Sequence, residues 1–210
     1  MDRAIDIVYV REKIPNDIFT TLELKELLKG YQNQGAKIAS LIHHQHIIPL
    51  RRGLYAFSEP LRKAPLSDGV MANSIYGPSY VSEEFALSYH GLIPETPGVV
   101  TSITMGRSRT FTNEFGVFTY RYCRSKAYPI GVTLAGGEHR RFLMASPFKA
   151  LYDKALNDTR WDGDDPECYL EEDLRIDLDV LQTQDKQTLH DLAPFMKGHL
   201  TKLYHFLERL

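Results

Sequence analysis

The hydrophobic residues in the first part of the chain recur at helical spacing in three short segments. Residues 3–13 predict a first helix, whose buried side would carry Ile5, Val8 and Tyr9. Pro15 ends this pattern, because proline lacks the backbone N–H that a continuing helix uses. We therefore expect one short amphipathic helix before residue 15.

A second helix is predicted to begin at Thr20. Thr20 and Glu23 have the spacing of a capping box, in which each side chain accepts a hydrogen bond from the other residue's backbone N–H. Gly30 is the expected stop, since glycine commonly ends helices. The expected buried stripe consists of Leu22, Leu24, Leu27 and Leu28.

The third segment, residues 33–44, predicts a helix with two different faces. Ile38, Leu41 and Ile42 follow one another at spacings of three and one and would face the core. The opposite face is polar, and side chains such as serine, glutamine and lysine can contact DNA bases or phosphates. The candidate DNA-binding residues of this helix are Gln34, Lys37, Ser40 and His44.

Residues 47–57 predict a β-hairpin with a basic tip. Two apolar runs flank the loop Arg51-Arg52-Gly53, and a three-residue loop that ends in a left-handed glycine is a common hairpin connection. Two helices followed by a basic hairpin are typical of a winged helix-turn-helix, whose wing contacts the phosphates beside the recognition helix. Arg51 and Arg52 therefore join the candidate DNA-binding residues.

Beyond residue 63 the pattern mixes helices with strands. We predict the fold class α+β, with an N-terminal winged helix-turn-helix over residues 1–63 and a mixed α+β domain over residues 64–210. Strand 99–105 is expected to pair with 109–111. The other predicted elements are helices over 68–75, 82–91, 146–155 and 192–207, a strand over 116–122, and a hairpin over 131–144.

Charge is divided unevenly between these two parts. Residues 1–63 carry a balance of +3 and residues 64–210 a balance of −5, within a formal net charge of -2. A mildly basic front and an acidic back suggest different partners for each. Much of the negative charge lies in 158–185, which we interpret as a solvated linker before the last helix. The alternatives are a segment that repels DNA or a surface for a basic partner.

The composition suggests a cytoplasmic protein. The two cysteines, Cys123 and Cys168, are too few and too far apart for a disulfide framework or a paired-cysteine metal site. No apolar run approaches the ~18 residues of a membrane span, and the charged start is not followed by an apolar signal core. We expect no membrane partner.

Four segments in order resemble the AbiEi-type antitoxin and transcriptional regulator family of type IV toxin–antitoxin systems. Together they extend over roughly residues 5–157. Each segment alone is only moderately specific, and their order and spacing carry the resemblance. The segments are Arg51-Arg52-Gly53-Leu54-Tyr55, residues 79–94, the strand 99–104, and residues 145–153.

The resemblance implies two activities. The winged helix would bind operator repeats in double-stranded DNA and repress the protein's own operon. The α+β domain would oppose a nucleotidyltransferase-like toxin, generally without a stable complex. The alternative is a winged-helix module that binds a protein, or a stand-alone regulator without an antitoxin role.

Sequence motifs for catalysis or cofactor binding are missing. Asp177 and Asp179 have the spacing of a nucleotidyltransferase carboxylate pair, but the chain contains no Gly-Ser dipeptide for the triphosphate loop. Phosphate-loop, serine-hydrolase and zinc-protease motifs are also missing. His43, His44 and His46 have no neighbouring cysteine or carboxylate that would complete a metal site. We therefore predict no enzymatic activity, no cofactor and no metal.

Overall fold

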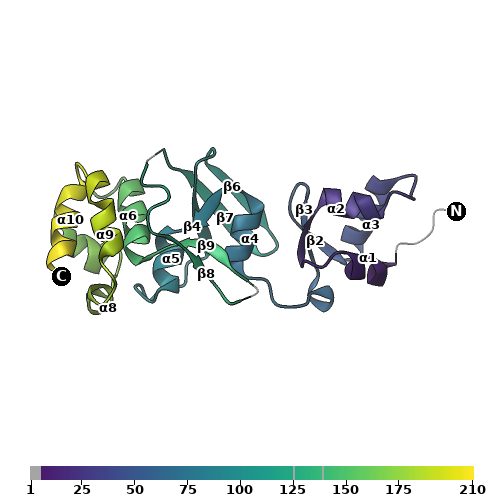
Figure 1. Cartoon of the computed structure of the whole chain (residues 1–210), viewed down its shortest axis with the longest axis horizontal. Coiled ribbons are helices and arrows are strands. Elements are labelled where there is room, and N and C mark those ends of the chain that lie inside the picture. The colour runs from purple at the N-terminus through teal and green to yellow at the C-terminus, as the bar shows by residue number, and fades with distance from the viewer. Residues whose placement is uncertain (1–5, 125, 139) are drawn as a thin grey trace.

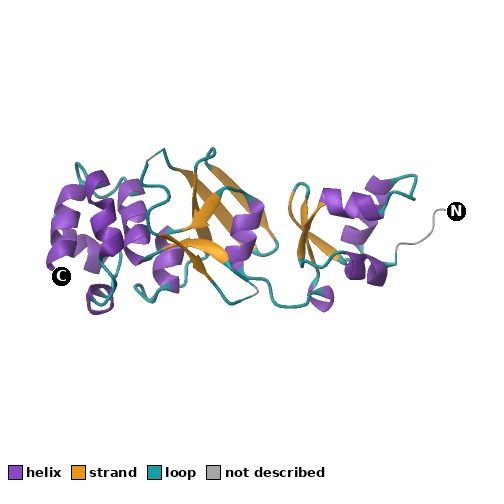
Figure 2. Cartoon of the chain, viewed as in Figure 1, coloured by secondary structure: helices purple, strands orange, loops and turns teal. Residues whose placement is uncertain are grey.

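The computed structural model describes residues 6–124, 126–138 and 140–210 (Figure 1). The fold is mixed α+β, with helix α1 (Ile7–Lys13) and helix α10 (Leu200–Arg209) at opposite ends of an elongated molecule. Figure 2 shows a helical C-terminal end, a central sheet with flanking helices, and a smaller unit that carries its own strands and helices. In the described ranges, no helix is long and apolar enough to cross a membrane.

The N-terminal unit, residues 6–63, contains three helices and a three-stranded antiparallel sheet. The sheet has the order β1-β3-β2, so β3 lies in the centre. Val10, Phe19, Leu24, Leu41 and Phe57 lie in its hydrophobic core. Its elements are α1 (Ile7–Lys13), β1 (Ile18–Thr20), α2 (Thr21–Leu27), α3 (Gln34–His43), β2 (Ile47–Arg51) and β3 (Leu54–Phe57).

The predicted buried side of the first helix is wrong. Val8 and Tyr9 are 59% and 47% exposed, and Val10 is the residue of α1 that enters the core. Ile5 lies outside the described residues. Asp6 caps the helix by accepting hydrogen bonds from the backbone of Val8 and Tyr9.

The second helix begins as the sequence predicts and ends earlier. The capping box of Thr20 and Glu23 is confirmed. Leu24 and Leu28 are buried, but the expectation for Leu22 is wrong, because its side chain is 77% exposed in the first turn. Helix α2 ends at Leu27, and Gly30 belongs to the turn that follows.

The hairpin has a shorter loop than predicted. Arg51 still pairs with Leu54, so Arg52 and Gly53 form a two-residue connection. A bulge between Pro49 and Arg51 shifts the register of β2. Gly53 has a φ of 84°, which confirms its left-handed conformation. The bulge changes which residues face the core, and strict alternation cannot predict that change.

The C-terminal unit, residues 64–210, is built on a six-stranded mixed sheet with the order β6-β7-β5-β4-β9-β8. The predicted pairing of residues 99–105 with 109–111 is wrong, because β6 pairs with β7, and β7 lies parallel to β5. The elements from the linker to the end of the sheet region are η1 (Glu59–Leu61), α4 (Asp68–Ile75), β4 (Ser79–Val81), α5 (Glu83–Tyr89), β5 (Val99–Thr104), β6 (Arg109–Asn113), β7 (Gly116–Tyr122), β8 (Val132–Ala135), β9 (Phe142–Ala145) and α6 (Pro147–Asn157).

The acidic segment 158–185 is folded, which corrects its interpretation as a solvated linker. Trp161 stacks on Tyr169 with ring centroids 4.3 Å apart, and both are buried. Asp158 is also buried and pairs with Lys154 and Arg160, whereas Asp162, Asp164 and Asp165 face solvent. The predicted single last helix is also divided in two, because Pro194 and Gly198 interrupt it. The elements are α7 (Pro166–Cys168), η2 (Tyr169–Asp173), α8 (Leu178–Gln182), α9 (Gln187–Leu192), η3 (Ala193–Phe195) and α10 (Leu200–Arg209).

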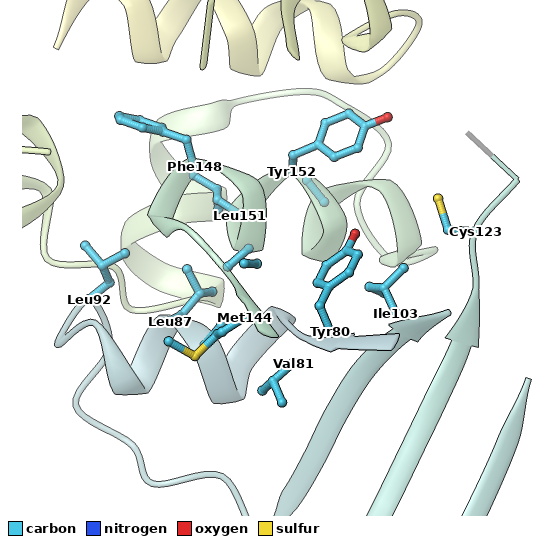
Figure 3. Packing of buried hydrophobic residues seen from close by; sticks show 14 of the residues in the cluster. Tyr80, Val81, Leu87, Leu92, Ile103, Cys123, Met144, Phe148, Leu151 and Tyr152 are labelled. Atoms are coloured by element: carbon cyan, nitrogen blue, oxygen red, sulfur yellow. The ribbon is translucent and has the colours of Figure 1, made fainter. Parts of the chain in front are cut away.

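The large core extends from the sheet into the C-terminal helices. Figure 3 shows Tyr80, Leu87, Ile103, Met144 and Leu151 gathered from β4, α5, β5, β9 and α6. The same cluster of buried side chains also includes three residues from the hairpin of the N-terminal unit: Leu50, Leu54 and Ala56. One face of the hairpin therefore contributes to the hydrophobic core of the C-terminal unit.

Candidate nucleic-acid interface

Helix α3 presents its polar side to solvent. The side chain of Asn33 caps the helix by accepting a hydrogen bond from the backbone N–H of Ala36 (3.0 Å). Ile38 and Leu41 are buried, as predicted, which leaves Ser40 and His44 exposed on the opposite side. The helix therefore offers an accessible polar face.

Gln34 has a different position from the other candidates on this helix. Its Nε2 donates a hydrogen bond to the carbonyl of Leu28 (3.1 Å), the C-terminal cap of α2. The side chain thus fixes the turn between α2 and α3, and its amide nitrogen is used inside the protein. Such a contact sets the angle at which α3 is presented.

Lys37, Ser40 and His44 lie along the accessible side of α3. The Nζ of Lys37 lies 5.1 Å from the ring centroid of Tyr31, a cation–π distance. The Nδ1 of His44 donates a hydrogen bond to the carbonyl of Ser40 (2.8 Å), which leaves Nε2 as the outer nitrogen of the ring. The rings of His44 and His46 stack with centroids 6.1 Å apart. In the part of the chain that the structure describes, no three His, Cys, Asp or Glu side chains are grouped as a metal site requires.

The two arginines at the hairpin tip have different surroundings. The Nε of Arg51 donates a hydrogen bond to the carbonyl of Ile75 at the end of α4, and its Nη1 donates to the carbonyl of Arg52 (2.9 Å). Arg52 is exposed in the turn. The adjacent carbonyl of Gly53 accepts a hydrogen bond from the backbone of Thr21 (2.9 Å), which places the hairpin tip beside the start of α2.

The structure adds three residues that the sequence reasoning did not assign to the site. Tyr76, Arg109 and Phe111 line a pocket of about 380 Å³ together with Arg51 and Arg52. The guanidinium of Arg109 lies 5.7 Å from the ring centroid of Tyr76. No sequence signal links these residues to the hairpin, because their proximity depends on how the two units pack.

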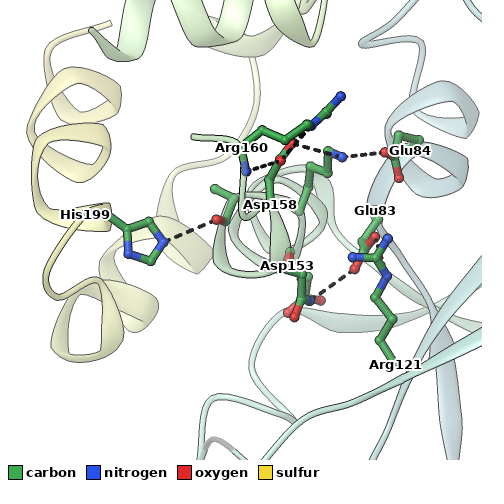
Figure 4. Close-up of polar contacts among 10 residues, drawn as sticks. Glu83, Glu84, Arg121, Asp153, Asp158, Arg160 and His199 are labelled. Carbon is green, nitrogen blue, oxygen red and sulfur yellow. Dashed lines mark hydrogen bonds and ion pairs between the residues drawn. The ribbon is translucent and has the colours of Figure 1, made fainter. Parts of the chain in front are cut away.

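A second polar cluster lies inside the C-terminal unit (Figure 4). Asp153 and Lys149 form an ion pair at 3.0 Å, and both side chains are buried. Asp153 also accepts hydrogen bonds from the hydroxyls of Tyr80 (2.9 Å) and Ser82 (2.8 Å). Ser82 precedes α5 as predicted, but its hydroxyl binds Asp153 instead of capping the helix. These contacts join β4 to α6.

Glu83 is the strained member of this cluster. It is fully buried and has a φ of 53°, a left-handed value that L-residues rarely adopt. Its Oε1 accepts a hydrogen bond from Asn157 (3.1 Å), and its Oε2 lies 3.4 Å from the Nε of Arg121. Burial raises the pKa of Glu83 to about 8, although Arg121 opposes this effect. The surrounding side chains are packed, so we assign this cluster a structural role.

Comparisons with known proteins assign the chain to no family. No model of a protein family matches it, and no curated protein matches it.

Proposed function

We propose that the N-terminal unit is a winged helix-turn-helix that binds double-stranded DNA. In this proposal α3 is the recognition helix in the major groove, and β2 and β3 form the wing. The observation that carries it is the exposed polar face of α3 in the same small unit as a hairpin whose tip is Arg51-Arg52. The core of the unit buries Ile38 and Leu41, which leaves the polar face available to DNA.

The candidate residues take different roles in this complex. Ser40 and His44 are exposed and would approach base edges, while Lys37 and Arg52 would contact phosphates. Gln34 would act by holding α3 at its angle to α2, because its amide nitrogen already binds Leu28. This assignment separates side chains that select a sequence from those that supply general affinity.

We further propose that the protein is the antitoxin of a type IV toxin–antitoxin system and represses its own operon. The support is the resemblance to the AbiEi-type family, whose segments correspond here to the hairpin, β4 with α5, β5, and the start of α6. The partner of the C-terminal unit would be a nucleotidyltransferase-like toxin, opposed without a stable complex in the cytoplasm. The protein would act without catalysing a reaction.

The second candidate is a winged-helix module that binds a protein, or a regulator with no antitoxin role. The packing of Leu50, Leu54 and Ala56 against the C-terminal unit favours it, because one face of the hairpin already serves a protein contact. The same packing decides whether a fragment or the full chain should be tested. A fragment that begins at residue 64 would expose the surface that these residues cover, so the full chain is the appropriate material.

A reporter assay tests the repressor role. The DNA upstream of the coding region is fused to a reporter gene, and the full chain is supplied from a second promoter. We expect repression by the wild type and its loss when Ser40→Ala is combined with Arg52→Ala. Co-expression with the neighbouring toxin then tests the antitoxin role, where this double variant should still protect. Reporter expression that the wild type leaves unchanged contradicts the repressor proposal.

A further inference from the structure

We propose that Arg109, in the C-terminal unit, binds a DNA phosphate together with Arg51 and Arg52 of the hairpin. This inference rests on the proposed DNA binding and extends it to the second unit. The three arginines line one pocket of about 380 Å³, although Arg109 begins β6 in a different sheet from the hairpin. Tyr76 and Phe111 complete the lining, so none of its five residues is acidic.

Two of the three arginines, Arg51 and Arg109, are held by groups that do not neutralise them. The Nε of Arg51 binds the main-chain carbonyl of Ile75, and the guanidinium of Arg109 lies over the ring of Tyr76. That ring is itself fixed by an edge contact with Tyr120, with centroids 5.3 Å apart. A carbonyl and an aromatic face orient a guanidinium but leave its full charge. Three cations in one pocket repel one another, and a bound anion would relieve that repulsion.

Two other clefts in the described part of the molecule have a mixed charge. A cleft of about 410 Å³ between the units is lined by Asp17 and Glu23 as well as Arg140. A cleft beside His44 and His46 contains both Arg62 and Glu114. Carboxylates in these clefts oppose the binding of a phosphate, whereas the pocket at Arg109 combines three guanidinium groups, a side-chain type that can form paired hydrogen bonds with phosphate oxygens.

The position of the pocket favours DNA over a small anion as the source of the phosphate. The hairpin that supplies Arg51 and Arg52 is the proposed wing. A duplex bound by α3 and the wing would therefore place its phosphate backbone beside the residues that line this pocket. The contact would bring the C-terminal unit onto the flank of the operator. Free phosphate compounds share this chemistry, and the experiment separates the two sources.

The test measures binding of a fluorescent duplex, taken from the DNA upstream of the coding region, by the full chain at several salt concentrations. Loss of one phosphate contact reduces the slope of log K against log salt by roughly 0.9 and the affinity about fivefold to tenfold at 0.1 M salt. We expect this result for Arg109→Gln. Arg109→Lys should retain most of the slope, because it keeps the charge. Arg209→Ala, an arginine of the last helix, is the matched control and should bind as the wild type does.

Each outcome decides a different point. Wild-type protein that fails to bind the duplex overturns the proposed function, and the inference falls with it. Wild-type binding with an Arg109→Gln slope equal to that of the wild type overturns this inference alone. Pyrophosphate is the small-anion probe. Micromolar pyrophosphate binding that requires Arg109, together with an unchanged DNA slope, would assign the pocket to a free anion and also overturn the inference. Circular dichroism of each variant verifies that it is folded.

Discussion

The Nε of Arg51 donates a hydrogen bond to the main-chain carbonyl of Ile75, the last residue of α4. This contact joins the hairpin of the N-terminal unit to a helix of the C-terminal unit. The amide of Asn113 adds a second link by donating to the carbonyl of Leu50 (3.1 Å). The proposed wing therefore also joins the two units, and Arg51 makes a structural contact in addition to the phosphate contact proposed for it.

Replacing Arg51 should weaken the fold. In Arg51→Ala the carbonyl of Ile75 loses a charged donor, and we expect the free energy of unfolding to fall by about 1–2 kcal/mol. Arg52→Ala removes an exposed side chain of the turn. This variant should change the free energy of unfolding by less than about 0.5 kcal/mol. Urea denaturation of the two variants measures the difference. Equal losses would contradict the role of Arg51 in joining the two units.

Replacing Arg52 should weaken DNA binding without changing sequence preference. The guanidinium is expected to contact phosphate, so Arg52→Ala should lower affinity for specific and unrelated duplexes by the same factor. The slope of log K against log salt should fall by about one. Anisotropy titrations with both duplexes check this expectation. A loss confined to the specific duplex would mean that Arg52 reads bases instead.

Stability should fall as the pH rises from about 4.5 to 8. The pKa of Glu83 is raised to about 8 in the folded protein, above its ordinary value of 4.5. Below the ordinary pKa the carboxyl of Glu83 is protonated in both the folded and the unfolded protein, so its burial carries no cost of ionisation. Between the two values the unfolded chain releases the proton and the folded chain retains it, so unfolding becomes easier by about 1 kcal/mol for each pH unit.

Glu83→Gln tests this pH dependence. The variant should lose the decline between pH 4.5 and 8 and should be more stable than the wild type above pH 8. Glu171→Gln, an exposed position, is the control and should keep the wild-type profile. The groups that surround Glu83 are Arg121 from β7, Glu84 from α5, and Asp153 and Lys154 from α6. A wild-type profile in Glu83→Gln would contradict the assignment to Glu83.

Breaking the buried ion pair should be costly. Asp153→Asn leaves the ammonium of Lys149 buried without a counter-charge, and we expect a loss of about 3–5 kcal/mol in the free energy of unfolding. The control is Asp164→Asn, which removes an exposed pair with Lys202 and should cost far less, because solvent screens an exposed pair. Thermal or urea unfolding compares them. A small effect in Asp153→Asn would contradict the structural role assigned to this ion pair.

Local signals in the sequence predicted several elements of the fold. The capping box at Thr20 and Glu23 and the left-handed Gly53 are confirmed. These features depend on residues within a few positions of one another. Asp68–Ile75 was also predicted with its observed bounds. Short-range chemistry therefore predicted where these elements begin, although α2 ends before the expected Gly30.

Features that depend on distant residues were missed. Residues 109–113 pair with β7 instead of β5, because β5 takes β7 as its parallel neighbour and β4 on its other side. The acidic segment is folded because Trp161 and Tyr169 stack beneath it. Arg109 lies in the candidate site only because the two units pack against each other. Neither periodicity nor composition predicts such contacts.

The most direct test of the central claim is an anisotropy titration of the duplex upstream of the coding region with the full chain, repeated across salt concentrations. The account predicts binding at least about 10³-fold tighter than to a scrambled duplex, with log K falling linearly as log salt rises. Protein that is folded by circular dichroism yet binds both duplexes equally, or binds neither, would contradict the account.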